Sequence, residues 1–276
     1  MDKKMKSLLT ITIIALIFFS NTLYAAEKIH EDWVQADRTF IRKVVKKLKQ
    51  EPLKIDEVLL TSGGKKEKLG FGYHFISGSH GKGYVSIFYQ FVYYNNQLLS
   101  FELQPQMPRD EQLILIYKKF YENIFDIDLK NKITPYHHNL SKVDIPLTGY
   151  QSSLKIPKEI KYYMTPYSGI IYGNRGGYAN SLLQNRTRFL SITKGLNAET
   201  CIVLLFSINP ASRLTAYEYY LLNQDKFTKE EIKTIEKRIE LIFTELPDIT
   251  TMYGCKITVA KSRERVKSLL NESKTP

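Results

Sequence analysis

The sequence lacks most of the short motifs that identify enzymes and metal proteins. It contains no His-Glu-x-x-His, no His-x-His and no Cys-x-x-Cys, which argues against the common zinc and redox sites. It also lacks the Gly-x-Ser-x-Gly turn of serine hydrolases, the Gly-x-Gly-x-x-Gly dinucleotide loop and the Walker A loop. The sequence therefore predicts no metal and no cofactor, and it leaves open whether the protein is an enzyme.

Long apolar segments are also absent after the first 26 residues, so we expect no membrane span there. Those first residues have the layout of a secretory signal peptide: a lysine-rich start, an apolar run at 8–19, and small residues at Ala25 and Ala26. An uncleaved anchor is the alternative, but a spanning helix needs about 20 mostly apolar residues. We therefore expect an exported protein, periplasmic or secreted, with a signal peptide at 1–26.

The remaining region, 27–276, is predicted to be a single globular unit, because its apolar and charged fractions are those of an ordinary folded domain. Prolines punctuate the middle of the chain, so a division into 27–130 and 160–276 is the alternative. The sequence does not indicate an oligomeric state.

Acidic residues are too few to balance the basic ones, and the formal net charge is +12. The signal segment contributes three lysines against one aspartate, which leaves about +10 for the rest of the chain. Such a protein can bind anionic lipid, acidic glycan or nucleic acid. The lysines are spread along the chain, however, which favours a solvated surface over a nucleic-acid site.

Cysteine is scarce, with only Cys201 and Cys255. In an oxidising compartment an even pair usually closes, so we predict a disulfide between them that ties two neighbouring strands. Two separate buried thiols are the alternative. A catalytic thiol is disfavoured because no His or Asn constellation accompanies either cysteine.

Hydrophobic periodicity predicts an α+β fold, with an antiparallel β-meander, a second mixed set of strands and flanking amphipathic helices. Thr228 and Glu231 form a capping-box pattern at the start of one helix, and Pro247 follows its end. Helices are predicted at 33–50, 109–125, 178–184, 211–223, 228–245 and 261–271. Strands are predicted at 53–61, 69–77, 84–94, 97–104, 168–172, 187–193, 201–208 and 250–259.

The hairpin 84–104 carries a register conflict. A two-residue turn at Asn95 and Asn96 would pair Val92 with Leu99. The apolar residues of the two strands would then lie on opposite faces of the sheet. A one-residue slip restores the match. We therefore expect a loop of odd length with a bulge, or else an outgoing strand that is buried on both faces.

The best local candidate for a binding site is the segment Gly173, Asn174, Arg175, Gly176 and Gly177. Placed between a strand and a helix, its backbone amides and the Arg175 guanidinium could hold a phosphate or carboxylate. The competing interpretation is a tight turn that requires glycine at positive φ.

Histidines and carboxylates give weaker signals. Adjacent His137 and His138 would point to opposite faces of a strand, so they are poor joint metal ligands, and the other histidines are isolated. Asp110 and Glu111 fit the first turn of a helix. Envelope hydrolases often use a pair of catalytic carboxylates, and the candidates are Glu102, Asp110, Glu111, Asp126 and Asp128.

Aromatic residues on the meander could form a platform on which sugars or bases stack, or they could pack within the sheet. These residues are Tyr73, Tyr84, Phe88 and Tyr94.

Three functions compete. The leading hypothesis is a non-catalytic binding or accessory protein that docks on a protein partner or an anionic envelope component. The second is a hydrolase or transferase in which Arg175 holds an anionic substrate, and the third is an exported toxin or effector. An enzyme predicts a deep pocket where Arg175 meets a carboxylate or histidine, whereas a binding protein predicts an exposed apolar patch.

Overall fold

The computed structural model describes residues 29–48, 50, 54–106, 108–125, 136–138 and 156–272. Helices and antiparallel sheets occupy separate parts of the chain, which confirms the α+β class. The α-helices are α2 (Glu31–Leu48), α3 (Asp56–Leu59), α4 (Glu111–Phe125), α5 (Lys158–Tyr163), α6 (Gln184–Ile192), α7 (Ala198–Leu204), α8 (Pro210–Leu222), α9 (Lys229–Glu245) and α10 (Ser262–Glu272). The strands are β1 (Lys65–Gly70), β2 (Tyr73–Gly81), β3 (Ser86–Tyr94), β4 (Gln97–Gln106), β5 (Tyr136–His138), β6 (Arg175–Gly176), β7 (Ser181–Leu182), β8 (Asp248–Tyr253) and β9 (Lys256–Lys261).

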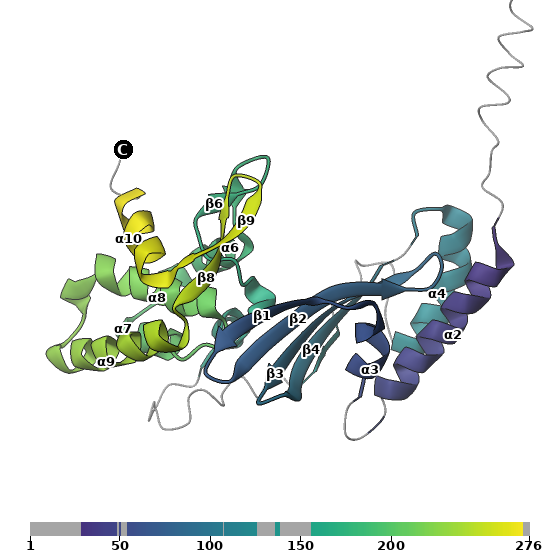
Figure 1. The fold of residues 1–276 in the computed structure, drawn as a ribbon, viewed down its shortest axis with the longest axis horizontal. Coiled ribbons are helices and arrows are strands. Elements are labelled where there is room, and N and C mark those ends of the chain that lie inside the picture. Colours follow the sequence, from purple (N-terminus) through teal and green to yellow (C-terminus); the bar gives the residue numbers. More distant parts are fainter. Residues whose placement is uncertain are drawn as a thin grey trace, which may run out of the picture.

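Strands β1 to β5 form one antiparallel sheet in sequence order. Strands β2, β3 and β4 correspond to predicted strands of the meander, whereas β1 lies after the predicted strand 53–61. Figure 1 shows α2, α3 and α4 at one end of this sheet and α7 to α10 at the other. The buried side chains form two clusters, and both include sheet residues: Phe91 and Phe101 pack with α2 and α4, whereas Phe75, Val92 and Leu99 pack with the C-terminal helices. The division of the chain into 27–130 and 160–276 stays a prediction.

The predicted bulge is confirmed, but the predicted odd loop length is wrong. The turn has two residues, Asn95 and Asn96, both at positive φ as a tight hairpin turn requires. Val92 pairs with Ser100, and the register shifts between Val92 and Tyr93. The bulge aligns Phe91 with Phe101 across the ladder. The end of β3 is also buried on both faces, so the two alternatives hold together.

The turn between β1 and β2 ties the sheet to the C-terminal helices. Phe71 has a φ of +55°, and its ring lies 4.9 Å from the Arg213 guanidinium and 4.3 Å from that of Arg238. The Phe71 amide donates to Glu245 Oε2 at 3.2 Å. Arg213 is fully buried and donates to the carbonyl of Leu69. Burial and the neighbouring Arg238 lower the pKa of Arg213 to about 9.

Two predicted strands in the C-terminal region are wrong. Residues 201–208 begin inside helix α7, and residues 187–193 lie mostly in α6. Helix α7 is capped by Asn197, whose side chain accepts from the Thr200 amide, and the residues from Thr200 to Leu204 are all buried. A helix buried on every side has no polar stripe, so its apolar run resembles a central strand.

Three shorter predictions are also wrong. Residues 53–61 include α3 and the start of the 3-10 turn Leu60–Ser62 rather than a strand. The segment 178–184 is the β6–β7 turn and strand β7, not a helix. In 168–172 only Tyr172 makes a bridge, to Thr251. Local propensity is weak in such short segments, and tertiary contacts decide their conformation.

The longer amphipathic helices are confirmed, with ends displaced by one or two residues, as α2, α4, α8, α9 and α10. The capping box of α9 forms as predicted between Thr228 and Glu231. No helix among the described residues has the length and apolar character needed to cross a membrane. The predicted signal peptide and the candidates Asp126 and Asp128 lie outside the described residues.

Candidate functional site

The segment from Gly173 to Gly177 leads into the hairpin β6–β7, and helix α6 begins only after that hairpin. Gly173 and Gly177 have φ values of +153° and +78°, and a Cβ on Gly176 would lie 2.4 Å from the Met252 sulfur. Arg175 is exposed, and its Nη1 donates to the Asn180 carbonyl at 3.1 Å. The glycines therefore have a conformational role. Ligand binding by Asn174 and Arg175 stays a prediction.

Hairpin β8–β9 lies beside this segment, because the Gly177 amide donates to the Gly254 carbonyl at 2.7 Å. Its ladder pairs Met252 with Ile257 and Thr250 with Val259, so these four side chains share one face. Ile257 is 45% exposed and Val259 is 68% exposed. We call this face, which also carries Asp248 and Lys261, the open face.

Strand β9 is an edge strand. It pairs with β8 on one side, and within the described part of the chain no strand pairs with its other side. Natural edge strands are usually short, charged or covered. Here lysines occupy only the two ends, at Lys256 and Lys261, and the exposed centre carries two β-branched residues with high strand propensity.

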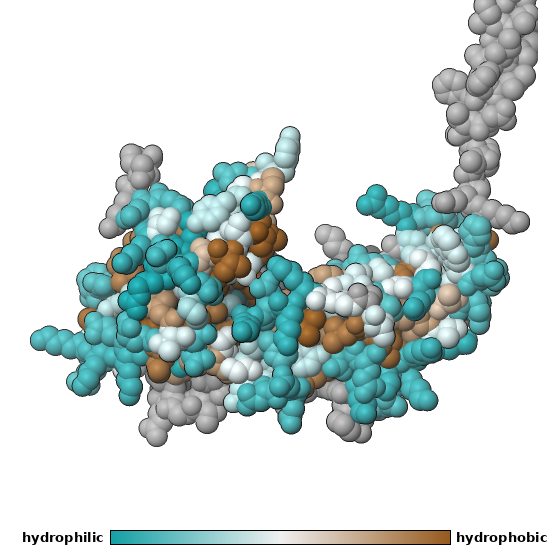
Figure 2. All heavy atoms as spheres, in the orientation of Figure 1, coloured by the Kyte–Doolittle hydropathy of each residue, from teal (hydrophilic) through white to brown (hydrophobic). Residues whose placement is uncertain are grey.

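Aromatic residues project from the ends of both hairpins. Tyr178, in the β6–β7 turn, is completely exposed, and Tyr253, at the end of β8, is 52% exposed. The Arg265 guanidinium lies 4.7 Å from the Tyr253 ring centroid. Of the ten large apolar side chains exposed in the described residues, half lie on these hairpins, and Figure 2 shows hydrophobic residues gathered there. We call these five the hairpin surface: Tyr178, Leu182, Tyr253, Ile257 and Val259.

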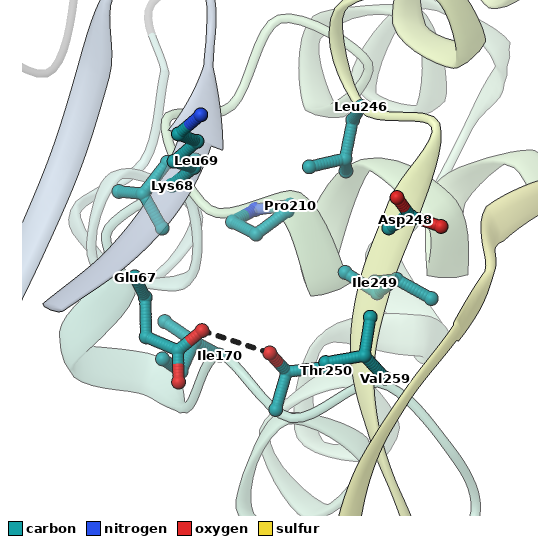
Figure 3. Close-up of a pocket in the computed structure, with 10 residues that line it drawn as sticks. All are labelled: Glu67, Lys68, Leu69, Ile170, Pro210, Leu246, Asp248, Ile249, Thr250 and Val259. Atoms are coloured by element: carbon teal, nitrogen blue, oxygen red, sulfur yellow. Dashed lines mark hydrogen bonds between the residues drawn. The ribbon is translucent and has the colours of Figure 1, made fainter. Parts of the chain in front are cut away.

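A small groove of about 150 Å³ adjoins the open face (Figure 3). Thr250 and Val259 border it from the hairpin, and Glu67 and Lys68 border it from β1. Thr250 Oγ1 donates to Glu67 Oε2 at 2.9 Å, which joins the two sides. A cavity of this size holds a benzene-sized group, so the groove can receive one apolar side chain.

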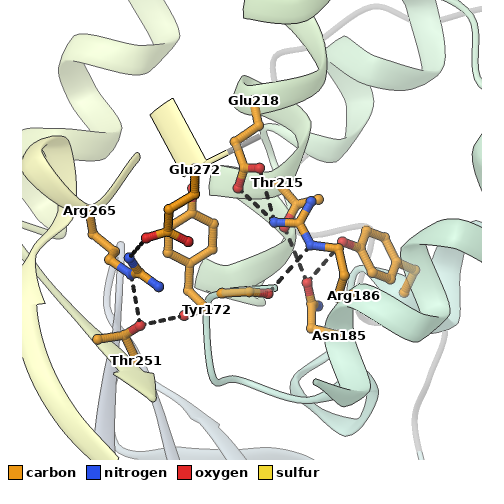
Figure 4. A network of polar contacts seen from close by, with 10 residues as sticks. Tyr172, Asn185, Arg186, Thr215, Glu218, Thr251, Arg265 and Glu272 are labelled. Atoms are coloured by element: carbon orange, nitrogen blue, oxygen red, sulfur yellow. Dashed lines mark hydrogen bonds and ion pairs between the residues drawn. The ribbon is translucent and has the colours of Figure 1, made fainter. Parts of the chain in front are cut away.

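Buried polar groups hold the hairpins on the helices (Figure 4). Thr251 Oγ1 donates to the Tyr172 carbonyl at 2.7 Å and accepts from Arg265 Nε at 3.1 Å. Arg186 Nη2 contacts both carboxylate oxygens of Glu218, at 2.9 and 3.0 Å. Burial and Glu218 raise the pKa of Tyr172 well above its usual value. This network fixes the hairpin base, so the exposed ends project from a rigid support.

Glu102 is more buried than the sequence suggests. It lies on β4 opposite His137 of β5, and only 8% of it is exposed. Burial raises the pKa of Glu102 to about 7, against the opposing effect of Arg188. Arg175, by contrast, lies on β6 beside the β8–β9 hairpin, so the structure does not bring Arg175 together with Glu102 or His137.

The other candidates have local partners. Asp110 Oδ1 accepts from the Leu113 amide at 3.0 Å, which explains its place before α4. Tyr73 is buried and packs against Tyr94 with the two rings tilted by 36° and their centroids 4.7 Å apart, as sheet packing predicts. The described residues contain no group of three or more potential metal ligands from His, Cys, Asp and Glu.

The predicted disulfide is wrong. Cys201 and Cys255 are both free thiols: Cys201 is buried in α7, and Cys255 is exposed in the turn between β8 and β9. Cys201 Sγ donates to the Ala216 carbonyl at 3.3 Å, and burial raises its pKa to about 12. The prediction placed both residues in paired strands, and it failed when 201–208 proved to begin as a helix.

Comparisons with protein-family models, with curated proteins and with solved structures find no match to this chain.

Proposed function

We propose that this chain is an exported, non-catalytic binding protein whose β9 edge accepts an extended segment of a partner protein. The observation that carries the proposal is the exposure of Ile257 and Val259 on an edge strand. An added strand would satisfy the outer backbone groups of β9 by main-chain hydrogen bonds.

Side-chain contacts would supply selectivity. Alternate residues of an added strand would lie beside Ile257 and Val259, because neighbouring strands in a sheet share their face alternation. The groove next to Val259 has room for one apolar side chain. Tyrosine and arginine are common at the energetic centre of interfaces, and Tyr253 with Arg265 lies next to the same strand.

Charge favours a different protein over a second copy of this one. Lys256 and Lys261 stand at the two ends of β9. Two copies of this chain would bring together two edges with a lysine at each end, on chains with a formal net charge of +12, and like charges repel. We therefore propose a partner segment with alternating apolar residues and an acidic residue beside Lys256, since Lys261 is already ion-paired with Asp248 at 2.9 Å.

Export rests on the signal-peptide pattern at 1–26. The enzyme alternative is the weaker one, because it depended on Arg175 in a pocket with a carboxylate or histidine, and Arg175 contacts a carbonyl on an exposed turn.

A pair of labelled peptides tests the proposal. The first alternates valine and threonine between terminal glutamates, and the second has terminal lysines instead. Fluorescence anisotropy should show about fivefold tighter binding of the glutamate peptide, as expected for roughly 1 kcal/mol of exposed charge interaction.

Two matched variants locate the site. Val259→Asp should abolish peptide binding, whereas Leu241→Asp, at an exposed leucine of α9, should leave it unchanged. Equal binding of the two peptides, or equal effects of the two variants, would contradict strand addition at β9.

A further inference from the structure

A second, separate groove lies between α2, α3 and the end of β2. Its volume is about 620 Å³, within the range of small-molecule sites. Figure 1 shows α3 between α2 and the sheet. The groove is far larger than the one beside Val259, and it shares no lining residue with it.

One stripe of α2 forms a wall of this groove. Its residues recur three and four positions apart, as residues on one helix face do: they are Asp32, Gln35, Ala36, Thr39, Phe40 and Lys43. Phe40 and Ala36 from α2, with Val58 from α3, give the groove an apolar surface.

His80 adds a polar group to this apolar surface. It is 8% exposed, and its ring meets the Phe40 ring edge-on at 5.1 Å between centroids. His80 Nε2 lies 3.3 Å from Thr61 Oγ1, and that hydroxyl donates to the Val58 carbonyl at 3.2 Å. The hydroxyl proton is therefore committed, so Nε2–H is the donor to Thr61. Burial and Lys82 lower the pKa of His80, which keeps the ring neutral near pH 7.

The charges around the groove are unbalanced at one end. Glu57 already binds Lys47 at 2.8 Å and Lys54 at 3.3 Å. Lys43, on the same rim, has no ion pair among the described residues. Asp32 lies eleven positions away along α2, which corresponds to about 16 Å at 1.5 Å per residue. An anion would therefore be attracted to the Lys43 end.

We propose that this groove binds a small amphipathic anion, with an aromatic or aliphatic body against Phe40 and Val58 and its anionic group at Lys43. The anionic group would pair with Lys43, which has no ion pair among the described residues; the groove's other lining lysine, Lys82, lies beside His80. This site is independent of the proposed strand addition at β9.

Two fluorescent probes that differ only in charge test the proposal on the full chain. 1-Anilinonaphthalene-8-sulfonate carries a sulfonate, and N-phenyl-1-naphthylamine is the same molecule without it. We expect saturable binding of both probes, with the sulfonate bound more tightly. Equal affinity for the two probes, or no saturable binding of the sulfonate, would overturn the proposal.

Variants of α2 provide matched controls. Lys43→Gln should weaken the sulfonate roughly two- to fivefold and leave the neutral probe unchanged, as expected for an exposed charge pair. Lys46→Gln, an exposed lysine of the same helix outside the groove, should change neither affinity. Equal effects of these two lysine variants would overturn the assignment to this groove.

Two further variants test location. Ala36→Phe, which fills the groove, should remove binding of both probes, with circular dichroism to check folding. Val259→Asp should leave both probes bound, because that residue lies on the other surface. Loss of probe binding in Val259→Asp would place the probes on the hairpin and sink the proposal. If Ala36→Phe does not fold, the comparison of Lys43→Gln with Lys46→Gln still tests the proposed site.

Discussion

Two β-hairpins have opposite surroundings in this molecule. The β3–β4 hairpin lies between two hydrophobic clusters, and Phe91 and Val92 are buried on its two faces. The β8–β9 hairpin has one face on the helices and one open, and Val259 is 68% exposed there. An apolar strand that is covered on both sides contributes to the stability of the fold. One that keeps apolar residues on an open edge costs stability or solubility unless a partner covers it.

The largest expected contrast is between the open hairpin β8–β9 and the buried core, and the two cysteines report on it. Cys255, exposed between β8 and β9, should react with a thiol reagent at the rate of a free thiol. Cys201 requires unfolding of the core around α7, so its reaction should be at least about a thousandfold slower. Mass spectrometry of the native chain after brief labelling measures both. Equal labelling of both cysteines would show that the C-terminal core is not closed.

The next largest effect is expected on the free energy of unfolding, from a substitution in the buried hairpin β3–β4. Phe91→Ala should lower the free energy of unfolding by about 3–5 kcal/mol, because it removes a fully buried ring between β4 and α2. Chemical denaturation measures the loss. A change below about 1 kcal/mol would mean that this face of β3 is not packed as described.

Glu102 should give a smaller, pH-dependent effect. Its folded-state pKa is raised to about 7 from 4.5, so its favourable contribution is fully present below pH 4.5 and is lost as the pH rises through 7. Glu102→Gln should therefore match the parent near pH 4 and be more stable by about 1–3 kcal/mol at pH 8. Exposed Glu111→Gln is the control. A stability difference that does not change with pH would contradict burial of this carboxylate.

The smallest effect on stability should come from the open face. Val259→Ala should change the free energy of unfolding by no more than about 0.5 kcal/mol, as usual for exposed positions. The same denaturation experiment measures it. A loss comparable to that of Phe91→Ala would mean that Val259 belongs to the core, and the comparison of the two hairpins would fail.

The sequence predicts features whose physics is local. The capping box of Thr228 and Glu231 depends on residues three positions apart, and the bulge beside Val92 follows from mismatched apolar faces of adjacent strands. Helix or strand identity of a short buried run such as 201–208 is not local, because full burial removes the periodicity that separates the two.

Prediction of the candidate site from the sequence is limited in the same way. The glycines and Arg175 indicated a site at hairpin β6–β7. The exposed residues Ile257 and Val259 of β9, however, resemble an ordinary buried strand in sequence. Their exposure depends on which strands pair with β9 and which helices cover it, and both are long-range contacts. The alternation in Lys256–Lys261, with a lysine at each end, is the only sequence signal that could have suggested an edge.

Site-specific photocross-linking tests the central claim, that β9 is a docking edge, most directly. A benzoylphenylalanine at position 259 in the exported chain should give one discrete protein adduct in the producing cells. That adduct should disappear when Ile257→Asp is added, and it should not form when the photoreactive residue replaces Leu241. No adduct from position 259, or the same adducts from both positions, would contradict the claim.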